Sequence, residues 1–234
     1  MAAFLNICGH FMECYKKMED KSFYLLGEMR GTAITIPQLE ATEVTEFLTI
    51  GFPIGGVEHE AVAVFMSKLD AEICRQYLNR QNHEGSRNTY ELLANTDSQV
   101  QIIKKTGNRP ARLVVGFVLD QTTRKLVVQG GLYSLMHFDL HATDQDWLLN
   151  GGQKPAHSVM ESVRREFLRM GEPGYQDELA ELEKLDEKSL ISLAKLAVLQ
   201  VGALPVGNPT IPAVFSPRRQ GWAELQVAGR HGTR

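Results

Sequence analysis

The strongest constraint on the fold comes from residues 111–119 (ARLVVGFVL), which are apolar at almost every position. A strand that is apolar on both faces needs protein on both sides, so this segment predicts a central strand of a covered sheet. Turns are expected at residues 120–123 and at Gly130-Gly131. Residues 124–129 and 132–141 then predict two further strands, which continue an antiparallel meander.

Other segments predict a mixture of strands and helices. Strands are expected at residues 32–36, 46–52 and 60–66, and a helix follows at once with Ser67 as its N-cap. Further helices are expected over the first twenty residues, on both sides of Gly171-Pro173, and at residues 187–201. Residues 89–106 predict a helix and then a short strand. The expected fold is α+β, with a mostly antiparallel sheet of about five strands, helices on one face and a C-terminal helical subdomain.

The chain divides by pattern into three parts. Residues 1–152 predict an α+β sheet domain, and residues 153–202 predict a helical subdomain packed on it. Residues 203–234 hold four prolines and four glycines, which predicts a mostly irregular, flexible tail.

Composition narrows the class of protein. Hydrophobic residues make up 43% of 234, and the net charge is −3, which excludes wholesale disorder and argues against a protein that coats nucleic acid. Three cysteines, Cys8, Cys14 and Cys74, indicate free thiols in a reducing compartment. The longest apolar run is too short to cross a bilayer, and no basic region precedes the first apolar residues. We therefore expect a cytoplasmic protein that does not bind a membrane.

One motif suggests metal chemistry. His137, Asp139 and His141 alternate along a predicted strand, so both imidazoles and the carboxylate would share a face. These groups are good zinc ligands, and Asp144 or Asp146 could then act as a base. The hypothesis is a metal-dependent hydrolase or phosphoesterase that uses zinc. The alternative is that these residues form a polar sheet face without a metal.

Charge suggests a second site. Six basic residues lie close together along the chain: Lys104, Lys105, Arg109, Arg112, Arg124 and Lys125. Some of them could meet at a hairpin and bind nucleic acid or an acidic partner. Residues 172–188 are strongly acidic instead, and a solvated surface of mixed sign also explains both blocks.

The helix predicted at residues 187–201 is apolar almost all round, so it is expected to be buried or to lie at an interface. An interface there would use Leu190, Leu193, Leu196, Val198 and Trp222, with a protein partner or a second copy on the other side.

A local pattern adds a resemblance. Residues 61–78 form a strand ending in V-x-V-F, followed by Ser67 and an amphipathic helix, and they resemble parts of small bacterial secretion-associated and immunity-type α+β proteins. No catalytic motif is complete. The expected function is therefore a non-enzymatic, cytoplasmic binding or regulatory accessory protein without a cofactor, acting through protein–protein contacts. The metal-dependent hydrolase and the nucleic-acid-binding protein are the alternatives.

Overall fold

The computed structural model describes residues 24–30, 44–54, 57–81, 88–94, 111–129, 131–139, 157–172, 174–205, 207 and 209–225. The helix predicted over the first twenty residues and the strand predicted at residues 32–36 lie outside these ranges. No helix within the described ranges is long and apolar enough to cross a membrane.

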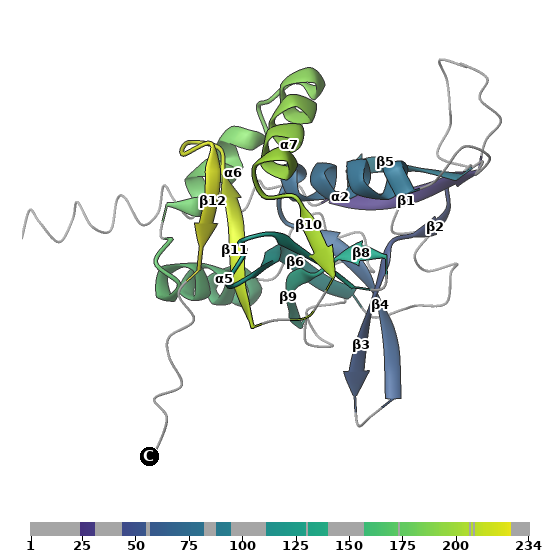
Figure 1. Cartoon of the computed structure of the whole chain (residues 1–234), viewed down its shortest axis with the longest axis horizontal. Helices are drawn as coiled ribbons and strands as arrows, with labels where there is room; N and C mark the ends of the chain where they lie inside the picture. The colour runs from purple at the N-terminus through teal and green to yellow at the C-terminus, as the bar shows by residue number, and fades with distance from the viewer. Residues whose placement is uncertain are drawn as a thin grey trace, which may run out of the picture.

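The described residues form four helices and twelve strands (Figure 1). The helices are α2 (Lys68–Gln81), α5 (His157–Arg169), α6 (Tyr175–Leu182) and α7 (Glu187–Val201). The first strands are β1 (Tyr24–Arg30), β2 (Val44–Phe47), β3 (Thr49–Ile54), β4 (Val57–Phe65), β5 (Asn88–Ala94) and β6 (Ala111–Asp120). The remaining strands are β7 (Leu126–Gln129), β8 (Leu132–Tyr133), β9 (Leu135–Asp139), β10 (Ala203–Pro205), β11 (Thr210–Ser216) and β12 (Gly221–Glu224).

The sheet confirms an α+β fold but is larger and more mixed than expected. Its main path runs β10-β7-β6-β4-β1-β2, and the other six strands attach to this path. The β4–β6 and β10–β7 pairs are parallel, and the other pairs are antiparallel. The expectation of about five strands was too low because several strands are short, and because three strands come from the segment predicted to be a tail.

Strand β6 is the centre of the sheet, as its apolar pattern predicts. It pairs with β4, β7, β9 and β11, and residues 113–117 are all buried. Gly116 lies at a register shift between β6 and β9. A Cβ atom placed there would lie 2.7 Å from the carbonyl oxygen of Ala213 on β11. Glycine is required at this position because β11 approaches the backbone of β6 so closely.

Helix α2 has the longest unbroken run of buried residues among the described helices. The Ser67 hydroxyl accepts a hydrogen bond from the Asp70 backbone N–H, which confirms the predicted N-cap. Residues 69–74 are all buried, and α2 packs against α6, α7, β1, β4, β5 and β8. A helix placed in this way connects the sheet to the other helices.

Two segments differ from the sequence prediction. Residues 88–94 form β5, which pairs with β1 along its whole length, where a helix was expected. Residues 203–225 contain β10, β11 and β12, where a mostly irregular tail was expected. Pro212 lies within β11, and its carbonyl oxygen accepts a hydrogen bond from the Leu225 N–H at 2.8 Å. Proline has no N–H, so it cannot donate a hydrogen bond to a neighbouring strand.

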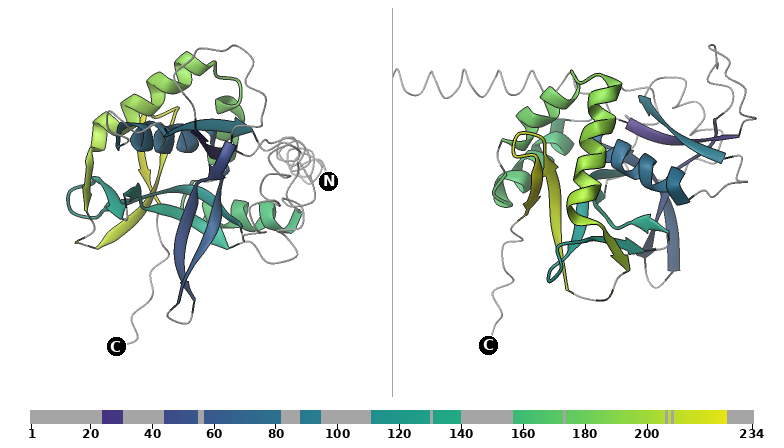
Figure 2. Two further views of the ribbon diagram at one scale, coloured as in Figure 1. Left: turned by 90° about the vertical axis from the view of Figure 1, so that its right-hand side faces the viewer. Right: turned by 45° about the horizontal axis from the view of Figure 1, so that its top comes forward.

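The hairpin of β3 and β4 projects from the body, on the side opposite α7 (Figures 1 and 2). Within the sheet, β4 pairs with β6 through residues 62–65 and with β1 at Phe65. Residues 57–61 pair with β3 alone among the described strands. The outer part of the hairpin is therefore a ribbon only two strands wide.

We expect Gly116→Ala to lower the free energy of unfolding by about 1–3 kcal/mol, because the new methyl group forces β11 away from β6. Chemical denaturation measures the change. Gly207→Ala is the matched control, since nothing lies within 4 Å of a Cβ atom there, and it should have almost no effect. Equal losses from both variants would contradict the close approach.

We also expect the fold to lose stability in alkali. Burial raises the pKa of Tyr133 to about 12, and neighbouring Cys74 and Tyr77 add to the shift. Between about pH 10 and pH 12 the unfolded chain has released this proton while the folded chain retains it. The unfolding free energy must then fall as pH rises, by up to about 1.4 kcal/mol per pH unit for one proton.

Tyr133→Phe tests this assignment because it removes the proton and keeps the ring that contacts Tyr77 and Phe117. The pKa values of Cys74 and Tyr175 are also raised by burial, so some pH dependence will remain. Urea denaturation at several pH values should show a shallower alkaline slope for the variant. An unchanged slope would show that Tyr133 does not carry the effect.

Candidate protein-docking surface

Helix α7 has clear signals at both ends. The Asp186 carboxylate accepts hydrogen bonds from the Ser189 backbone N–H at 2.8 Å and from the Ser189 hydroxyl at 3.0 Å. These bonds favour the charged carboxylate and lower the pKa of Asp186. Gly202, with φ of 63°, ends the helix. The two signals fix where α7 begins and ends.

One face of α7 is anchored to the body. Leu190, Ala194 and Ala197 are buried at helical spacing. The Gln76 side chain on α2 donates to the carbonyl oxygen of Ile191 at 3.2 Å. The Trp222 indole N–H on β12 donates to the carbonyl oxygen of Ala197 at 2.9 Å. Both bonds attach to the backbone of α7, so they set the rotation of the helix.

The bond from Gln76 belongs to a buried polar network on α2. The Glu72 side chain is 2% exposed, and its carboxylate accepts hydrogen bonds from Arg75 at 2.7 and 2.9 Å and from Gln76 at 2.9 Å. Arg75 also donates to Glu91 on β5 at 3.3 Å. The network satisfies a buried carboxylate and connects α7 and β5 to the same turn of α2.

The opposite face of α7 is a row of exposed residues that we call the outer stripe: Lys188, Ser192, Lys195 and Leu199. Their spacing of 4, 3 and 4 residues places them in one line along the helix. Leu199 is 81% exposed, the highest value among the large hydrophobic side chains of the described residues. The ion pairs between described residues include neither lysine of the stripe.

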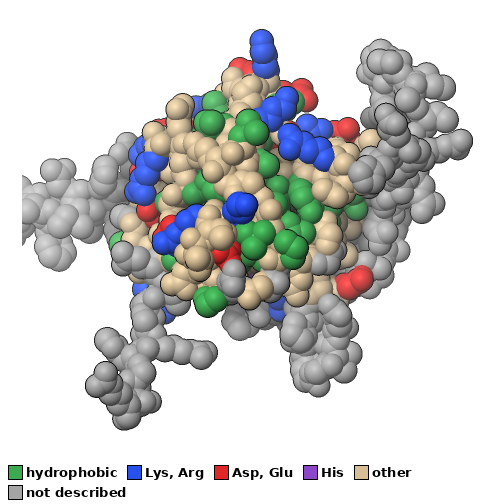
Figure 3. Space-filling model, in the orientation of Figure 1, with side chains coloured by type: hydrophobic (Ala, Val, Ile, Leu, Met, Phe, Trp, Pro, Cys, Tyr) green, Lys and Arg blue, Asp and Glu red, His purple; other side chains and the backbone are tan. Residues whose placement is uncertain are grey.

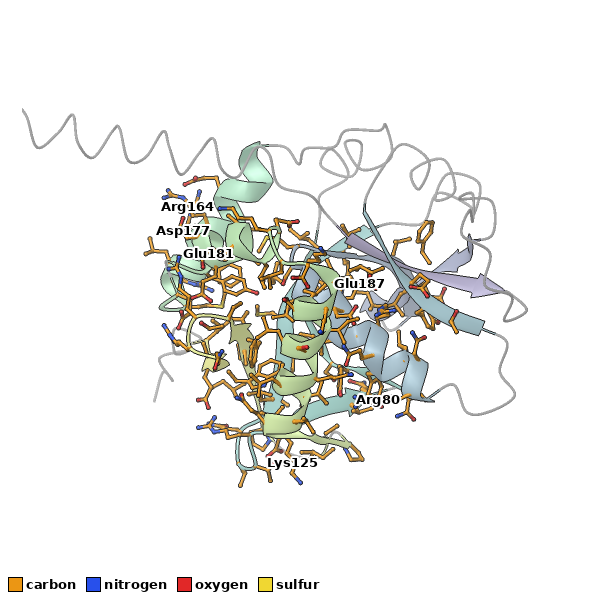
Figure 4. The ribbon with its side chains drawn as sticks, turned by 90° about the horizontal axis from the view of Figure 1, so that it is seen from above. Arg80, Lys125, Arg164, Asp177, Glu181 and Glu187 are labelled. Atoms are coloured by element: carbon orange, nitrogen blue, oxygen red, sulfur yellow. The ribbon has the colours of Figure 1, made fainter. Side chains whose placement is uncertain are left out.

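The surface views show the setting of this stripe. In Figure 3, hydrophobic side chains and Lys or Arg side chains lie side by side over α7. In Figure 4, Glu187 marks the N-terminal end of α7 and Lys125 lies beyond its C-terminal end. The exposed residues Ala203 and Pro205 of β10 continue the surface after α7. The outer stripe therefore presents one large apolar side chain and two lysines, while Asp186 and Glu187 are also exposed at the N-terminal end of α7. The stripe itself has the chemistry of a site for an apolar, acidic protein segment.

Of the interface residues predicted from the sequence, four are on α7, where only Leu190 lies on the fully buried face, and Trp222 is on β12. Leu190 is buried, and Leu193, Leu196, Val198 and Trp222 are partly buried against the core. The prediction that they lie at an interface with another protein stays a prediction. Lys188, Lys195 and Leu199 were missed as a group, although a helical wheel centred on Leu190, Ala194 and Ala197 places them opposite the buried face.

The predicted metal ligands are only partly described. His137 is on β9, and its Nε2 atom contacts the Arg112 guanidinium of β6, while its Nδ1 atom lies 3.2 Å from the Leu135 carbonyl oxygen. A guanidinium can only donate, so in this contact Nε2 presents its lone pair to Arg112 instead of to a metal ion. The side chain of Asp139 and all of His141 lie outside the description, so the zinc hypothesis stays a prediction.

The six predicted basic residues are not brought together where the structure describes them. Arg112 begins β6, whereas Arg124 and Lys125 follow its other end, and positions 112 and 120 are ~26 Å apart at ~3.3 Å per residue. Arg124 forms an ion pair with Glu224 at 2.9 Å. Lys104, Lys105 and Arg109 lie outside the described residues. Nucleic-acid binding through these residues therefore also stays a prediction.

The acidic block at residues 172–188 is used within the chain. The turn between β11 and β12 carries Arg218, which pairs with Glu181 at 2.6 Å, and Arg219, which pairs with Glu172 at 2.8 Å. The Ser216 hydroxyl donates to buried Glu178 at 2.8 Å. In Figure 4, Asp177 and Glu181 of α6 lie at the opposite end of the view from Lys125. These contacts fasten the β11–β12 hairpin to α6 and to the turn that precedes it.

Comparison with known proteins identifies no similar protein whose function could guide the interpretation of this fold. No family model matches the chain, and neither the curated proteins nor the solved structures include a significant match. Within the described ranges, no group of three or more His, Cys, Asp and Glu residues is arranged to hold a metal ion.

We expect Arg75→Met to lower the free energy of unfolding by about 3–5 kcal/mol, because it leaves the Glu72 carboxylate buried without its cation. Arg169→Met is the matched control. It breaks a pair with Glu166 that has the same i,i+3 spacing but is exposed, and such pairs contribute about 1 kcal/mol or less. Urea denaturation of both variants measures the difference, and similar losses would contradict the network.

Proposed function

We propose that this chain is a non-enzymatic binding protein, an accessory or regulatory factor that holds a protein partner on the outer stripe of α7. The partner presents apolar side chains beside carboxylates. The observation that carries the proposal is the exposure of Leu199 on a helix whose opposite face is anchored to the body.

The position of Leu199 supports an apolar contact with a partner. Single exposed leucines are common on protein surfaces and need no partner. Leu199, however, precedes the exposed Ala203 and Pro205 of β10 by four and six residues, across the junction where α7 ends. Such neighbouring apolar positions support a docking surface more strongly than isolated ones do.

The two lysines of the outer stripe would select a partner by its charge. Lys188 and Lys195 flank the stripe along one line of the helix, and the Ser192 hydroxyl between them donates to the Lys188 carbonyl oxygen at 2.9 Å. A partner with carboxylates would be attracted to this line and oriented by it, whereas a basic partner would be repelled. The stripe therefore favours an acidic, apolar segment.

Affinity capture with the tagged full-length chain from its native host tests the function. Each captured protein is purified, and its dissociation constant is measured by calorimetry. We expect Leu199→Glu to weaken binding at least about tenfold, because it places a carboxylate where apolar and acidic groups must dock.

Leu168→Glu on α5 is the matched control, since Leu168 is the other exposed large hydrophobic side chain among the described residues, at 58%. This variant should bind as tightly as the wild type. The proposal fails if nothing is captured, or if every captured protein binds the Leu199→Glu variant as tightly as the wild type.

A further inference from the structure

Strand β5 has one edge that no other described strand covers. All seven of its residues pair with β1, and β1 uses its other edge to pair with β2 and β4. The outer edge of a strand presents N–H and C=O groups that can bind the edge of another chain. Proteins avoid such association by covering or blocking the edge, so the surroundings of β5 show how this chain controls it.

Asn79 of α2 closes the outer edge of β5 near its middle. Its side-chain Oδ1 atom accepts a hydrogen bond from the Tyr90 backbone N–H at 2.7 Å, and its Nδ2 atom donates to the Tyr90 carbonyl oxygen at 3.0 Å. Two residues that form a hydrogen-bonded pair in an antiparallel sheet exchange these same two bonds. The amide of Asn79 therefore takes the place of the residue that an incoming strand would set opposite Tyr90.

The same two bonds define which residues of β5 direct their backbone groups outward. Successive residues of a strand direct these groups to alternate sides. Because those of Tyr90 point to Asn79, those of Thr89 and Glu91 point toward β1, and those of Leu92 point outward again. A strand added to this edge would bond to Tyr90 and Leu92 in turn. Asn79 thus interrupts the pairing at the first of these two positions.

Helix α2 places Asn79 against β5. Arg75 lies one turn earlier on the same side of the helix, and it donates to Glu91 at 3.3 Å. The Tyr77 ring, two residues before Asn79, contacts the Tyr133 ring with 4.1 Å between their centroids. Figure 1 shows α2 beside β5 and β1. Asn79 itself belongs to the last turn of α2, so opening the edge requires only this turn to withdraw.

The residue type suits a blocking role. The planar amide of asparagine carries a donor and an acceptor, as a peptide group does. Asparagine is a poorer helix former than alanine, leucine or glutamine, so position 79 is not filled to strengthen α2. Its bonds instead satisfy the backbone of a residue eleven positions further along the chain.

We propose that Asn79 keeps the edge of β5 closed against a second copy of this chain. Without the amide, the β5 edges of two copies would pair antiparallel about a two-fold axis, because each copy offers the same edge and the arrangement closes. The contact would consist mainly of backbone hydrogen bonds and would not use the outer stripe of α7. The inference is therefore independent of the function proposed above.

Asn79→Ala in the full-length chain tests the inference. The substitution removes both bonds to Tyr90 and leaves a better helix former in α2. We expect the variant to self-associate with a dissociation constant at least about tenfold lower than that of the wild type, as measured by analytical ultracentrifugation. Asn79→Ser has a side chain too short to make both bonds, so it should associate as well. It provides the test if the alanine variant does not fold.

Hydrogen exchange locates the contact. In the associated variant the N–H groups of Tyr90 and Leu92 would bond across the new contact, so residues 88–94 should exchange more slowly at high than at low protein concentration. Trp222→Phe is the matched control, because it also removes a bond from a side chain to the backbone, at Ala197, but opens no strand edge. This variant should associate no more than the wild type does.

Three results would overturn the inference: folded variants at position 79 that associate no more than the wild type, association without slower exchange in residues 88–94, or equal association of Trp222→Phe. The first would show that Asn79 only ties α2 to β5. None of these results affects the binding of a captured partner to the outer stripe, which Leu199→Glu tests separately.

Discussion

The arrangement of this protein depends on how the buried carboxylate of Glu72 is satisfied. A carboxylate in the interior is costly unless it is paired and fully hydrogen-bonded, and Glu72 receives bonds from Arg75 and Gln76 on its own helix. The same two side chains extend further, Arg75 to Glu91 on β5 and Gln76 to the backbone of α7. One buried charge therefore connects two other elements to the same turn of α2. An apolar residue at position 72 could fill the space, but it would not orient its neighbours through directed bonds.

Orientation matters because α7 is apolar around most of its circumference. Packing alone would accept several rotations of such a helix, since Leu193, Leu196 and Val198 could each replace Leu190 against the core. The bonds to the carbonyl oxygens of Ile191 and Ala197 select one rotation. That rotation leaves Lys188, Lys195 and Leu199 on the outside. The docking surface is thus a consequence of polar contacts made on the far side of the helix.

The same reasoning explains what the sequence could predict. Strand β6, the N-cap of α2 and the extent of α7 follow from local patterns, and the structure confirms them. The segment NTYELLA has no clear period, and its strand β5 exists because β1 offers it a partner. Prolines made residues 203–225 resemble a tail, yet β11 is held by distant partners in β6 and by Arg–Glu pairs to α6. The exposed face of α7 depends on contacts with α2 and β12, which no local pattern contains.

The position of the outer stripe follows from how rigidly the body of the protein is built. Residues 62–65 of β4 pair with β6, the most buried strand, so the centre of the fold is a stiff sheet. Helix α7 is fixed to this body by the hydrogen bonds from Gln76 on α2 and from Trp222 on β12. The outer stripe is thus held in place before a partner arrives, and this stiffness would give a contact on it a low conformational entropy cost.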